Sequence, residues 1–293
     1  MSFVVVTDTS GNLPSSRVRK AGLHLIPFSY YIDEKEYSCT DTEAFDGDEF
    51  YARIKGGLAV TTSQITPQHY ADFFEPFLKE GQDVLYVSMS SGISGSCDCA
   101  RVAAKMLLED HPDRIVEIVD TKGASLGEGL VALEAARLRD RGLGVTEAAE
   151  KLRDYSRRMC NVFTVDDLMH LKRGGRLSAV KALVGSVLNL KPLLKGNEDG
   201  KIVSFASVRG RKRAIEALAD RFNKFAVNPE SQIVGIAQAG CREDAKYLME
   251  LLRKEHPPKE ILPVEYEPVT GSHVGPGALA LFFLSNETVR FEC

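Results

Sequence analysis

A loop rich in serine and glycine offers the clearest chemistry in this sequence. Residues 90–96, SSGISGS, directly follow a β-prone run at 83–89 and precede a helical pattern that starts at Cys97. Such a loop points several backbone N–H groups at one spot, with the positive end of the helix dipole behind them. The sequence therefore predicts a binding site for an anion, with the Ser94 hydroxyl as a candidate ligand-binding group. Capping of the helix by Ser94 explains the same residue equally well.

A second candidate is a strongly cationic corner at residues 172–176, Lys172-Arg173-Gly174-Gly175-Arg176, called the basic corner below. Adjacent glycines permit backbone conformations that are closed to other residues, here at a place where charges converge. An apolar run over residues 180–194 follows, too short and too broken to span a membrane. Its spacing favours a buried helix followed by a buried strand, and it is also a candidate wall for an apolar ligand.

A single histidine, His273, lies in the glycine- and proline-rich residues 271–279, which predict a rigid loop around it. Ser94, His273 and an aspartate, Asp8 or Asp120, are the residue types of a hydrolase triad. The segment around Ser94 fails the GxSxG nucleophile pattern, because its last position is serine. A hydrogen-bonded loop histidine explains His273 about as well as a functional role does.

The sequence lacks the usual motifs for cofactors and metals. Residues 123–129 have the wrong glycine spacing for a dinucleotide fingerprint, and no GxxxxGK[ST] phosphate loop occurs. No pair of histidines stands at metal-ligand spacing, and Cys97 and Cys99 match neither a zinc pair nor a CxxC redox motif. We therefore expect no metal and no cofactor.

The composition limits the possible classes of protein. With 293 residues, 44% hydrophobic and 27% charged, the chain is expected to form about two domains with real cores. A net charge of −4 without a long basic run argues against nucleic-acid binding. The first residues lack the charged and apolar regions of a signal peptide. Six dispersed cysteines are typical of reduced thiols, so a cytoplasmic protein is expected.

Strand and helix patterns alternate in the first half of the chain. Residues 60–67 are expected to be a polar loop in which Thr66 caps the following helix. The alternation predicts a largely parallel sheet with helices on both faces, and hence an N-terminal α/β domain over residues 1–158. The expected strands are 3–7, 24–31, the region around Tyr37, 83–89 and 114–119, and the expected helices are 14–21, 42–55, 68–80, 97–108, 126–141 and 146–158.

After residue 158 the pattern changes. Residues 196–200 predict a turn between neighbouring strands, so that some strands should be antiparallel. The sequence thus predicts a second α/β domain with a mixed sheet over residues 159–293. The expected strands are 162–165, 189–194, 201–207, 232–238 and 261–267, and the expected helices are 179–186, 210–225 and 243–255.

Six short motifs resemble those of the DegV family, in the same order and over essentially the whole chain. They are residues 6–14 (VTDTSGNLP), Thr62-Ser63-Gln64, residues 90–95 (SSGISG), Val119-Asp120-Thr121, the basic corner and His273-Val274-Gly275-Pro276-Gly277. Each motif is weak alone, whereas six in order form a specific match. Ile65-Thr66 and Ser96-Cys97 depart from the family pattern. The second departure lies beside the expected ligand and could alter tail specificity.

The resemblance implies a two-domain α/β protein that holds one long-chain fatty acid in a cavity between its domains. It implies a carrier without catalysis of its own, which presents the fatty acid carboxylate to a separate ATP-dependent fatty acid kinase subunit for phosphorylation to an acyl phosphate. The carboxylate would be bound by Thr62, Ser94 and His273. The residues that would support this site are Ser63, Ser91, Gly95, Arg173, Arg176 and Arg209.

Two other functions remain open from the residues alone: a serine hydrolase that acts on a lipid-like ester, and a module that binds a carbohydrate or small anion. A fatty acid needs a long apolar slot closed by a few polar donors. Burial of about fifteen methylene groups at ~0.8 kcal/mol each would contribute on the order of 10 kcal/mol, before the costs of association. We expect at most transient contact with a membrane.

Overall fold

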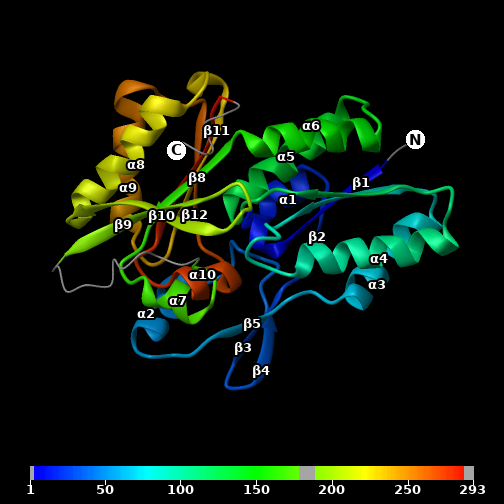
Figure 1. Ribbon diagram of the computed structural model, residues 1–293, viewed down its shortest axis with the longest axis horizontal. Coiled ribbons are helices and arrows are strands. Elements are labelled where there is room, and N and C mark those ends of the chain that lie inside the picture. Colours follow the sequence, from blue (N-terminus) through cyan, green and yellow to red (C-terminus); the bar gives the residue numbers. More distant parts are fainter. Residues whose placement is uncertain (1–2, 178–188, 287–293) are drawn as a thin grey trace. The chain divides into compact units, whose positions relative to one another are not determined.

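The computed structural model describes residues 3–177 and 189–286, and it divides the chain into two compact units (Figure 1). The first unit comprises Met1–Phe45 and Thr61–Arg157, and the second comprises Asp46–Val60 and Arg158–Cys293. The chain therefore leaves the first unit after residue 45 to contribute a short segment to the second unit, returns at residue 61, and leaves again after residue 157.

A four-stranded parallel sheet forms the centre of the first unit. Its strands are β1 (Phe3–Asp8), β2 (Leu23–Ile26), β6 (Asp83–Ser88) and β7 (Val116–Asp120), in the order β2-β1-β6-β7. Every residue of β1 and β6 is buried, which agrees with their nearly unbroken apolar sequences. The predicted parallel sheet is confirmed.

Helices cover both faces of this sheet, as expected (Figure 1). α3 packs beside α4, and α5 packs beside α6. α3 begins where predicted, because Thr66 Oγ1 accepts a hydrogen bond from His69 N (3.2 Å) and Pro67 occupies the first turn. The helices of this unit are α1 (Ser15–Lys20), α3 (Pro67–Lys79), α4 (Ser96–Asp110), α5 (Leu126–Asp140), α6 (Val145–Arg157) and the short 3-10 helix η1 (Thr9–Gly11).

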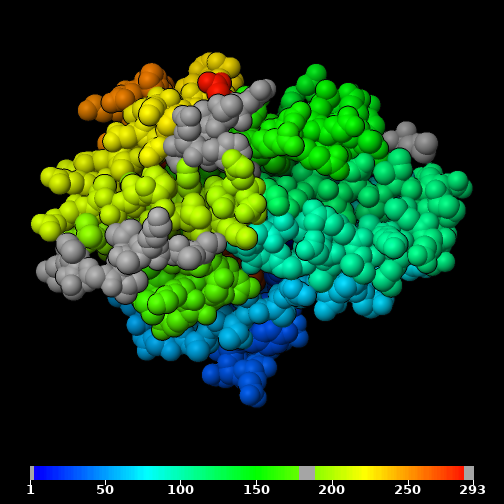
Figure 2. Space-filling view, viewed as in Figure 1, coloured from blue at the N-terminus to red at the C-terminus, as the bar shows by residue number. Residues whose placement is uncertain are grey.

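A separate three-stranded antiparallel sheet also belongs to the first unit. It consists of β3 (Ser29–Ile32), β4 (Lys35–Ser38) and β5 (Thr61–Ser63), in the order β4-β3-β5. Asp33 and Glu34 form the turn between β3 and β4, both in the left-handed conformation that a tight hairpin requires. This turn is exposed at the surface (Figure 2). The polar loop expected at residues 60–67 thus contains a short strand.

The second unit contains a six-stranded mixed sheet, in the order β10-β9-β8-β13-β11-β12. β11 and β12 pair in parallel, whereas the other neighbouring strands are antiparallel. This confirms the predicted mixed sheet, although the sequence does not predict β13. The strands are β8 (Met159–Thr164), β9 (Leu190–Gly196), β10 (Ile202–Arg209), β11 (Ile233–Gln238), β12 (Glu260–Glu265) and β13 (Leu279–Leu284).

α8 and α9 pack together on the sheet of the second unit and bury an apolar core, in which the rings of Phe222 and Phe283 meet edge to face. α2 begins later than predicted, because Asp46 caps it by accepting from Glu49 N (3.0 Å). The helix predicted at residues 179–186 lies outside the described residues. The helices are α2 (Gly47–Lys55), α7 (Met169–Arg173), α8 (Arg211–Phe225), α9 (Arg242–Glu255), α10 (Pro268–Val274) and the 3-10 helix η2 (Pro229–Ser231).

The sequence predicts a rigid loop over residues 271–279, and this prediction is wrong for residues 271–274, which belong to α10, whereas residues 275–278 do form a loop. The Glu267 carboxylate begins the helix by accepting from Val269 N (2.6 Å) and Thr270 N (2.5 Å). Gly271 lies inside the helix, where a side chain would collide with Tyr51 of α2. A capping carboxylate and close packing thus outweigh the low helix propensity of glycine.

Three further findings bear on the class of protein. Cys39, Cys97, Cys99 and Cys241 are free thiols, as expected, whereas Cys160 is disulfide-bonded and the expectation is wrong for it. Within residues 3–177 and 189–286, no helix is both long and apolar enough to cross a bilayer. In the same ranges no group of three or more histidine, cysteine or acidic side chains could hold a metal ion.

Candidate functional site

The carboxyl ends of β1, β6 and β7 lie at one edge of the parallel sheet, and residues 90–95, called the serine loop, follow β6 there. The next strand along the chain, β2, lies on one side of β1, whereas β6 lies on the other. The direction of winding therefore changes between β1 and β6. Ligands of open α/β sheets bind at such a switch point, beyond the carboxyl ends of the strands.

Hydrogen bonds to Ser90 fold the serine loop tightly. Ser90 Oγ accepts from Gly92 N (3.0 Å), and Ser90 O accepts from Ile93 N and Ser94 N (both 3.2 Å). Ser94 Oγ accepts from Ser96 N (3.2 Å) and donates to Ser96 Oγ (3.0 Å). Gly95 is the N-cap of α4, so Ser94 precedes the cap position that the simpler interpretation gave it. Its half-buried hydroxyl nevertheless accepts from the first N–H of the helix, at a helix start where negative charge is favoured.

The segment of Thr62 is joined to the serine loop through the residues that follow it. Ile65 N donates a hydrogen bond to Ser96 Oγ (3.2 Å). A Cβ atom at Gly95 would lie 2.3 Å from Gln64 Oε1, so the side chain of Gln64 packs directly over this glycine. The structure therefore brings the segments of Thr62 and Ser94 together at the start of α4.

Two tyrosines share a face with Thr62, and the sequence does not predict them as site residues. Tyr30 is directly opposite Thr62 in the register, and Tyr37 is directly opposite Tyr30. Opposite residues of antiparallel strands point to the same face, and the two rings stack with centroids 5.5 Å apart. Ser63 points to the other face, where its Oγ lies 3.5 Å from Tyr31 Oη. The alternating aromatic residues around the hairpin turn are the signal that could have identified the pair.

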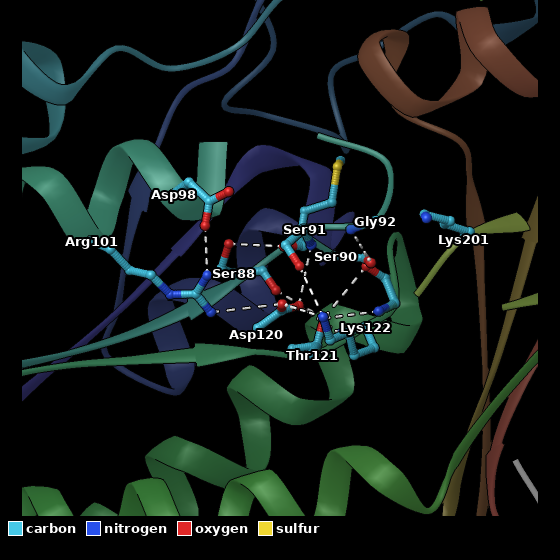
Figure 3. A network of polar contacts seen from close by, with 12 residues as sticks. Ser88, Ser90, Ser91, Gly92, Asp98, Arg101, Asp120, Thr121, Lys122 and Lys201 are labelled. Carbon is cyan, nitrogen blue, oxygen red and sulfur yellow. Dashed lines mark hydrogen bonds and ion pairs between the residues drawn. The ribbon is translucent and has the colours of Figure 1, made fainter. Parts of the chain in front are cut away.

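Asp8 and Asp120, the candidate aspartates of a hydrolase triad, accept hydrogen bonds from groups other than histidine. The Asp120 carboxylate accepts from Ser91 N (3.2 Å) and Lys122 N (3.0 Å) (Figure 3). The Asp8 carboxylate accepts from Ser10 N (2.9 Å) and Tyr86 Oη (2.7 Å). A triad requires an aspartate that orients the catalytic histidine. The described residues of the first unit therefore do not favour the hydrolase.

A buried carboxyl pair lies at the end of β1. Asp8 and Glu128 are fully buried, and Ser10 Oγ is hydrogen-bonded to both carboxyl groups. A hydroxyl has one proton to donate, so one of the two carboxyl groups must itself be protonated and donate to Ser10. Asp8 already accepts from Ser10 N and Tyr86 Oη. Asp8 is therefore the ionised member of the pair, and Glu128 is the protonated acid.

Burial, and secondly the charge of Asp8, raise the pKa of Glu128 well above its ordinary range. Thr7 Oγ1 donates to the other Glu128 oxygen (2.9 Å). The hydroxyls of Tyr70 and Tyr86, 2.7 Å apart, extend the network to α3 and β6. The sequence signal for this network is faint: one glutamate between two glycines in the otherwise apolar residues 126–133.

In the second unit, His273 packs against the basic corner. A Cβ atom at Gly174 would lie 2.6 Å from His273 Nδ1, so the imidazole rests directly on the glycine. Gly175 has a φ of +71°, and Arg176 Nη1 donates to Gly174 O (2.5 Å). The two glycines therefore have different tasks, because Gly174 makes room for the histidine and Gly175 permits the turn.

Burial lowers the pKa of His273 to about 4, and the Arg176 guanidinium adds to this shift. His273 is therefore neutral at physiological pH, so its imidazole can donate one hydrogen bond but supplies no charge. The positive charge beside it comes from Arg176. An anion bound at this place would raise the pKa of His273.

Arg173 and Arg176 have different contacts in the basic corner. Arg173 is exposed, donates through Nε to Met169 O (3.2 Å), and has an ion pair with Asp167 at 3.8 Å. Arg176, by contrast, influences His273. The surface around Arg173 is therefore accessible to a partner molecule.

Arg209 lies at the far end of its strand from the basic corner. Leu177, the residue after Arg176, forms a bridge with Ile202 at the start of β10, whereas Arg209 ends β10. At about 3.3 Å per residue, the backbones of Ile202 and Arg209 are roughly 20 Å apart. The structure thus separates Arg209 from the other predicted cations of this site.

The chain is similar over its whole length to proteins of known structure. Residues 2–286 match the model of the DegV family, which is described as uncharacterised. A DegV domain-containing protein of Clostridium perfringens is 37% identical over 284 residues, covering 97% of this chain and 98% of the relative. A DegV family protein of Thermus thermophilus, whose structure is described by its fatty acid binding, is 30% identical with a TM-score of 0.87, over 97% of this chain and 100% of that one. DegV of Bacillus subtilis, described as a fatty acid binding protein, is 30% identical with a TM-score of 0.83, over 98% and 100%.

Proposed function

Because this chain belongs to the DegV family, we propose that it binds one long-chain fatty acid and presents the carboxylate to a separate ATP-dependent kinase subunit, which forms the acyl phosphate. The observation that carries the binding proposal is the junction of the Thr62 segment with the serine loop. At this junction, hydroxyl groups and a helix start can receive a carboxylate at the switch point of the sheet. Relatives from Thermus thermophilus and Bacillus subtilis, described as binding fatty acids, support the choice of ligand.

The proposed head-group ligands are Thr62, Ser94 and His273. A carboxylate that enters an apolar site loses its hydration and needs dedicated donors. Two hydroxyls and a neutral imidazole supply hydrogen bonds, and Arg176 supplies charge. Ser91 and Gly95 support the site indirectly, through the shape of the serine loop. Arg209 is left out of this proposal, because of its place at the far end of β10.

The tail of the fatty acid requires an apolar wall. The leucines of β9, Leu193 and Leu194, are buried, and Leu193 belongs to the core beneath α8 and α9. This part of the apolar run therefore serves its own unit. Residues 180–188 of the run lie outside the described residues.

Purified protein is expected to carry a fatty acid that native mass spectrometry detects and denaturation releases.

Thr62→Ala and Ser94→Ala should each weaken fatty acid binding by ~1–3 kcal/mol, because a hydrogen bond to a charged group is lost. His273→Ala should weaken it at least as much. Ser231→Ala, in η2, is the matched control and should bind as the wild type does. Unchanged affinity in all three folded site variants would place the carboxylate elsewhere.

Presentation to the kinase is expected to depend on Arg173. Arg173→Glu should slow acyl phosphate formation about tenfold at physiological salt and leave fatty acid affinity unchanged, because an exposed charge acts on the encounter with a partner. Arg176→Glu should reduce both quantities. Arg213→Glu, an exposed residue in the first turn of α8, is the control of equal charge change. A wild-type rate of acyl phosphate formation in Arg173→Glu would show that the kinase docks elsewhere. Catalytic turnover by the isolated chain, in the absence of the kinase, would contradict a carrier role.

A further inference from the structure

Asp120 lies beside the start of the serine loop. Ser88 and Asp120 pair with each other as the last residues of β6 and β7. The serine loop begins two residues after Ser88, and residues 121–125 leave β7 at the same edge of the sheet. The two loops therefore run next to each other from a shared starting point.

Three hydrogen bonds tie residues 120–123 to the serine loop. Asp120 Oδ1 accepts from Ser91 N (3.2 Å), and Lys122 Nζ donates to Ser91 Oγ (2.9 Å) (Figure 3). Gly123 O accepts from Ser90 N (2.8 Å). The first two residues of the serine loop are thus held by a carboxylate, an ammonium group and a carbonyl.

Lys122 also closes a ring with Asp120. Its backbone N donates to Asp120 Oδ1 (3.0 Å), and its Nζ lies 2.9 Å from Asp120 Oδ2. Lys122 has a φ of +54°, a left-handed conformation that residues other than glycine rarely adopt. Such strained conformations persist where the surroundings hold them, and they cluster at functional sites. In this conformation a single lysine reaches both Asp120 and Ser91.

The Asp120 carboxylate remains charged, so the ion pair persists. Burial favours a higher pKa for Asp120, but hydrogen bonds from Ser91 and Lys122 hold the pKa below its usual value. Arg101 is a second cation nearby, at 3.8 Å from Asp120 Oδ2, but its closer partner is Asp98 at 2.6 Å (Figure 3). Lys122 is therefore the main counter-ion of Asp120.

We propose that Asp120 and Lys122 are positioning residues that clamp the serine loop and thereby set the place of the Ser94 hydroxyl. This inference rests on the proposed function, because it assigns the clamp to the head-group site for the fatty acid. Ser94 N is hydrogen-bonded to Ser90 O, so a shift of Ser90 and Ser91 moves Ser94 as well. The ammonium group of Lys122 acts through Ser91 and does not touch the ligand.

Hydrogen exchange of the ligand-free protein tests the clamp without any ligand. Lys122→Met removes the ammonium group and keeps the aliphatic stem, Lys122→Arg retains the charge, and Lys105→Met, exposed in α4, is the matched control. In Lys122→Met, the amides of residues 90–95 should exchange at least about threefold faster than in the wild type. The other two variants should exchange at the wild-type rate. Wild-type exchange of this loop in folded Lys122→Met overturns the clamp.

Affinity for a fatty acid tests whether the clamp positions the Ser94 hydroxyl for binding. Lys122→Met should lower the affinity about tenfold, and Lys122→Arg should restore most of it. In a Ser94→Ala background, Lys122→Met should have little further effect, because the clamp acts through Ser94. Effects that multiply would mean that Lys122 acts on the ligand itself, which overturns the positioning role. A wild-type chain that binds no fatty acid would refute the proposed function, while the exchange rates still decide the clamp.

Discussion

Replacement of Gly174 by alanine is expected to weaken fatty acid binding by about tenfold or more, because a misplaced binding group loses most of its effect. The backbone of Gly174 has φ −71° and ψ −8°, which any residue can adopt. The new methyl group would lie 2.6 Å from His273 Nδ1 and 3.5 Å from its Cε1, so the imidazole has to move. A donor moved by about an ångström no longer has hydrogen-bond geometry toward the carboxylate. Titration calorimetry with a soluble fatty acid measures the loss.

Gly175→Ala is the matched control for this experiment. Gly175 has a φ of +71°, and among the described residues no atom lies within 4 Å of a Cβ placed there. Alanine should therefore cost about 1–2 kcal/mol of folding stability through backbone strain, without touching His273. Thermal melts should show the loss of stability, and affinity should stay at the wild-type value. Full affinity in Gly174→Ala, with its methyl group in place, would remove His273 from the head-group site.

Asp8→Ala should lower the free energy of unfolding by about 3–5 kcal/mol, the effect of breaking a buried network on one side. The substitution leaves Ser10 N, the Ser10 hydroxyl and the Tyr86 hydroxyl facing a cavity in which the carboxylate was their acceptor. Denaturant unfolding, with fluorescence or circular dichroism as the signal, measures the change. Asp140→Ala, at the exposed end of α5, is a control that should change stability little. A loss below about 1 kcal/mol would mean that water or a rearranged neighbour replaces the carboxylate.

Glu128→Gln should have the opposite effect, and its size should depend on pH. The folded-state pKa of Glu128 is raised above its unfolded value, so its contribution to stability is fully present below about pH 4.5 and is lost as pH rises toward the folded pKa. Glutamine keeps the acceptor for Thr7 and the donor for Ser10, and it needs no proton. The variant should match the wild type near pH 5 and exceed it by up to about 1.4 kcal/mol per pH unit above that. A variant less stable than the wild type at every pH would identify Glu128 as ionised.

The regular framework could be predicted because its signals are local. β1 and β6 are apolar runs that end at polar loops, and both occur within a residue of the expected bounds. The start of α3 was equally clear, since a capping threonine and a first-turn proline determine it within two residues. The serine loop and the basic corner were identifiable for a similar reason, because adjacent small or charged residues are visible in the sequence itself.

The remainder depends on contacts between residues far apart in the chain. β13 is a short apolar run whose partners are β8 and β11, and nothing in its own residues separates it from a buried loop. α10 is a helix because Glu267 caps it and because Gly271, which suggests a break, is required by Tyr51. Gly174 makes room for His273, and Glu128 is the protonated partner of Asp8, so the role of each depends on a residue far away in the sequence. Composition and spacing cannot show which of two neighbouring glycines lies under an imidazole.

The segment that the second unit receives from residues 46–60 has a consequence for synthesis of the chain. Tyr51 Oη in α2 donates to Tyr266 O (2.6 Å), a residue that the ribosome adds 215 residues later. At about 5–20 residues per second, α2 leaves the ribosome roughly 10 to 40 s before its partner exists. During that interval Tyr51, which is buried in the finished protein, lacks both its acceptor in Tyr266 and its close neighbour Gly271. Nascent chains therefore carry α2 without its contacts to α10 until translation is nearly complete, and a fragment that begins at residue 158 would lack α2 altogether.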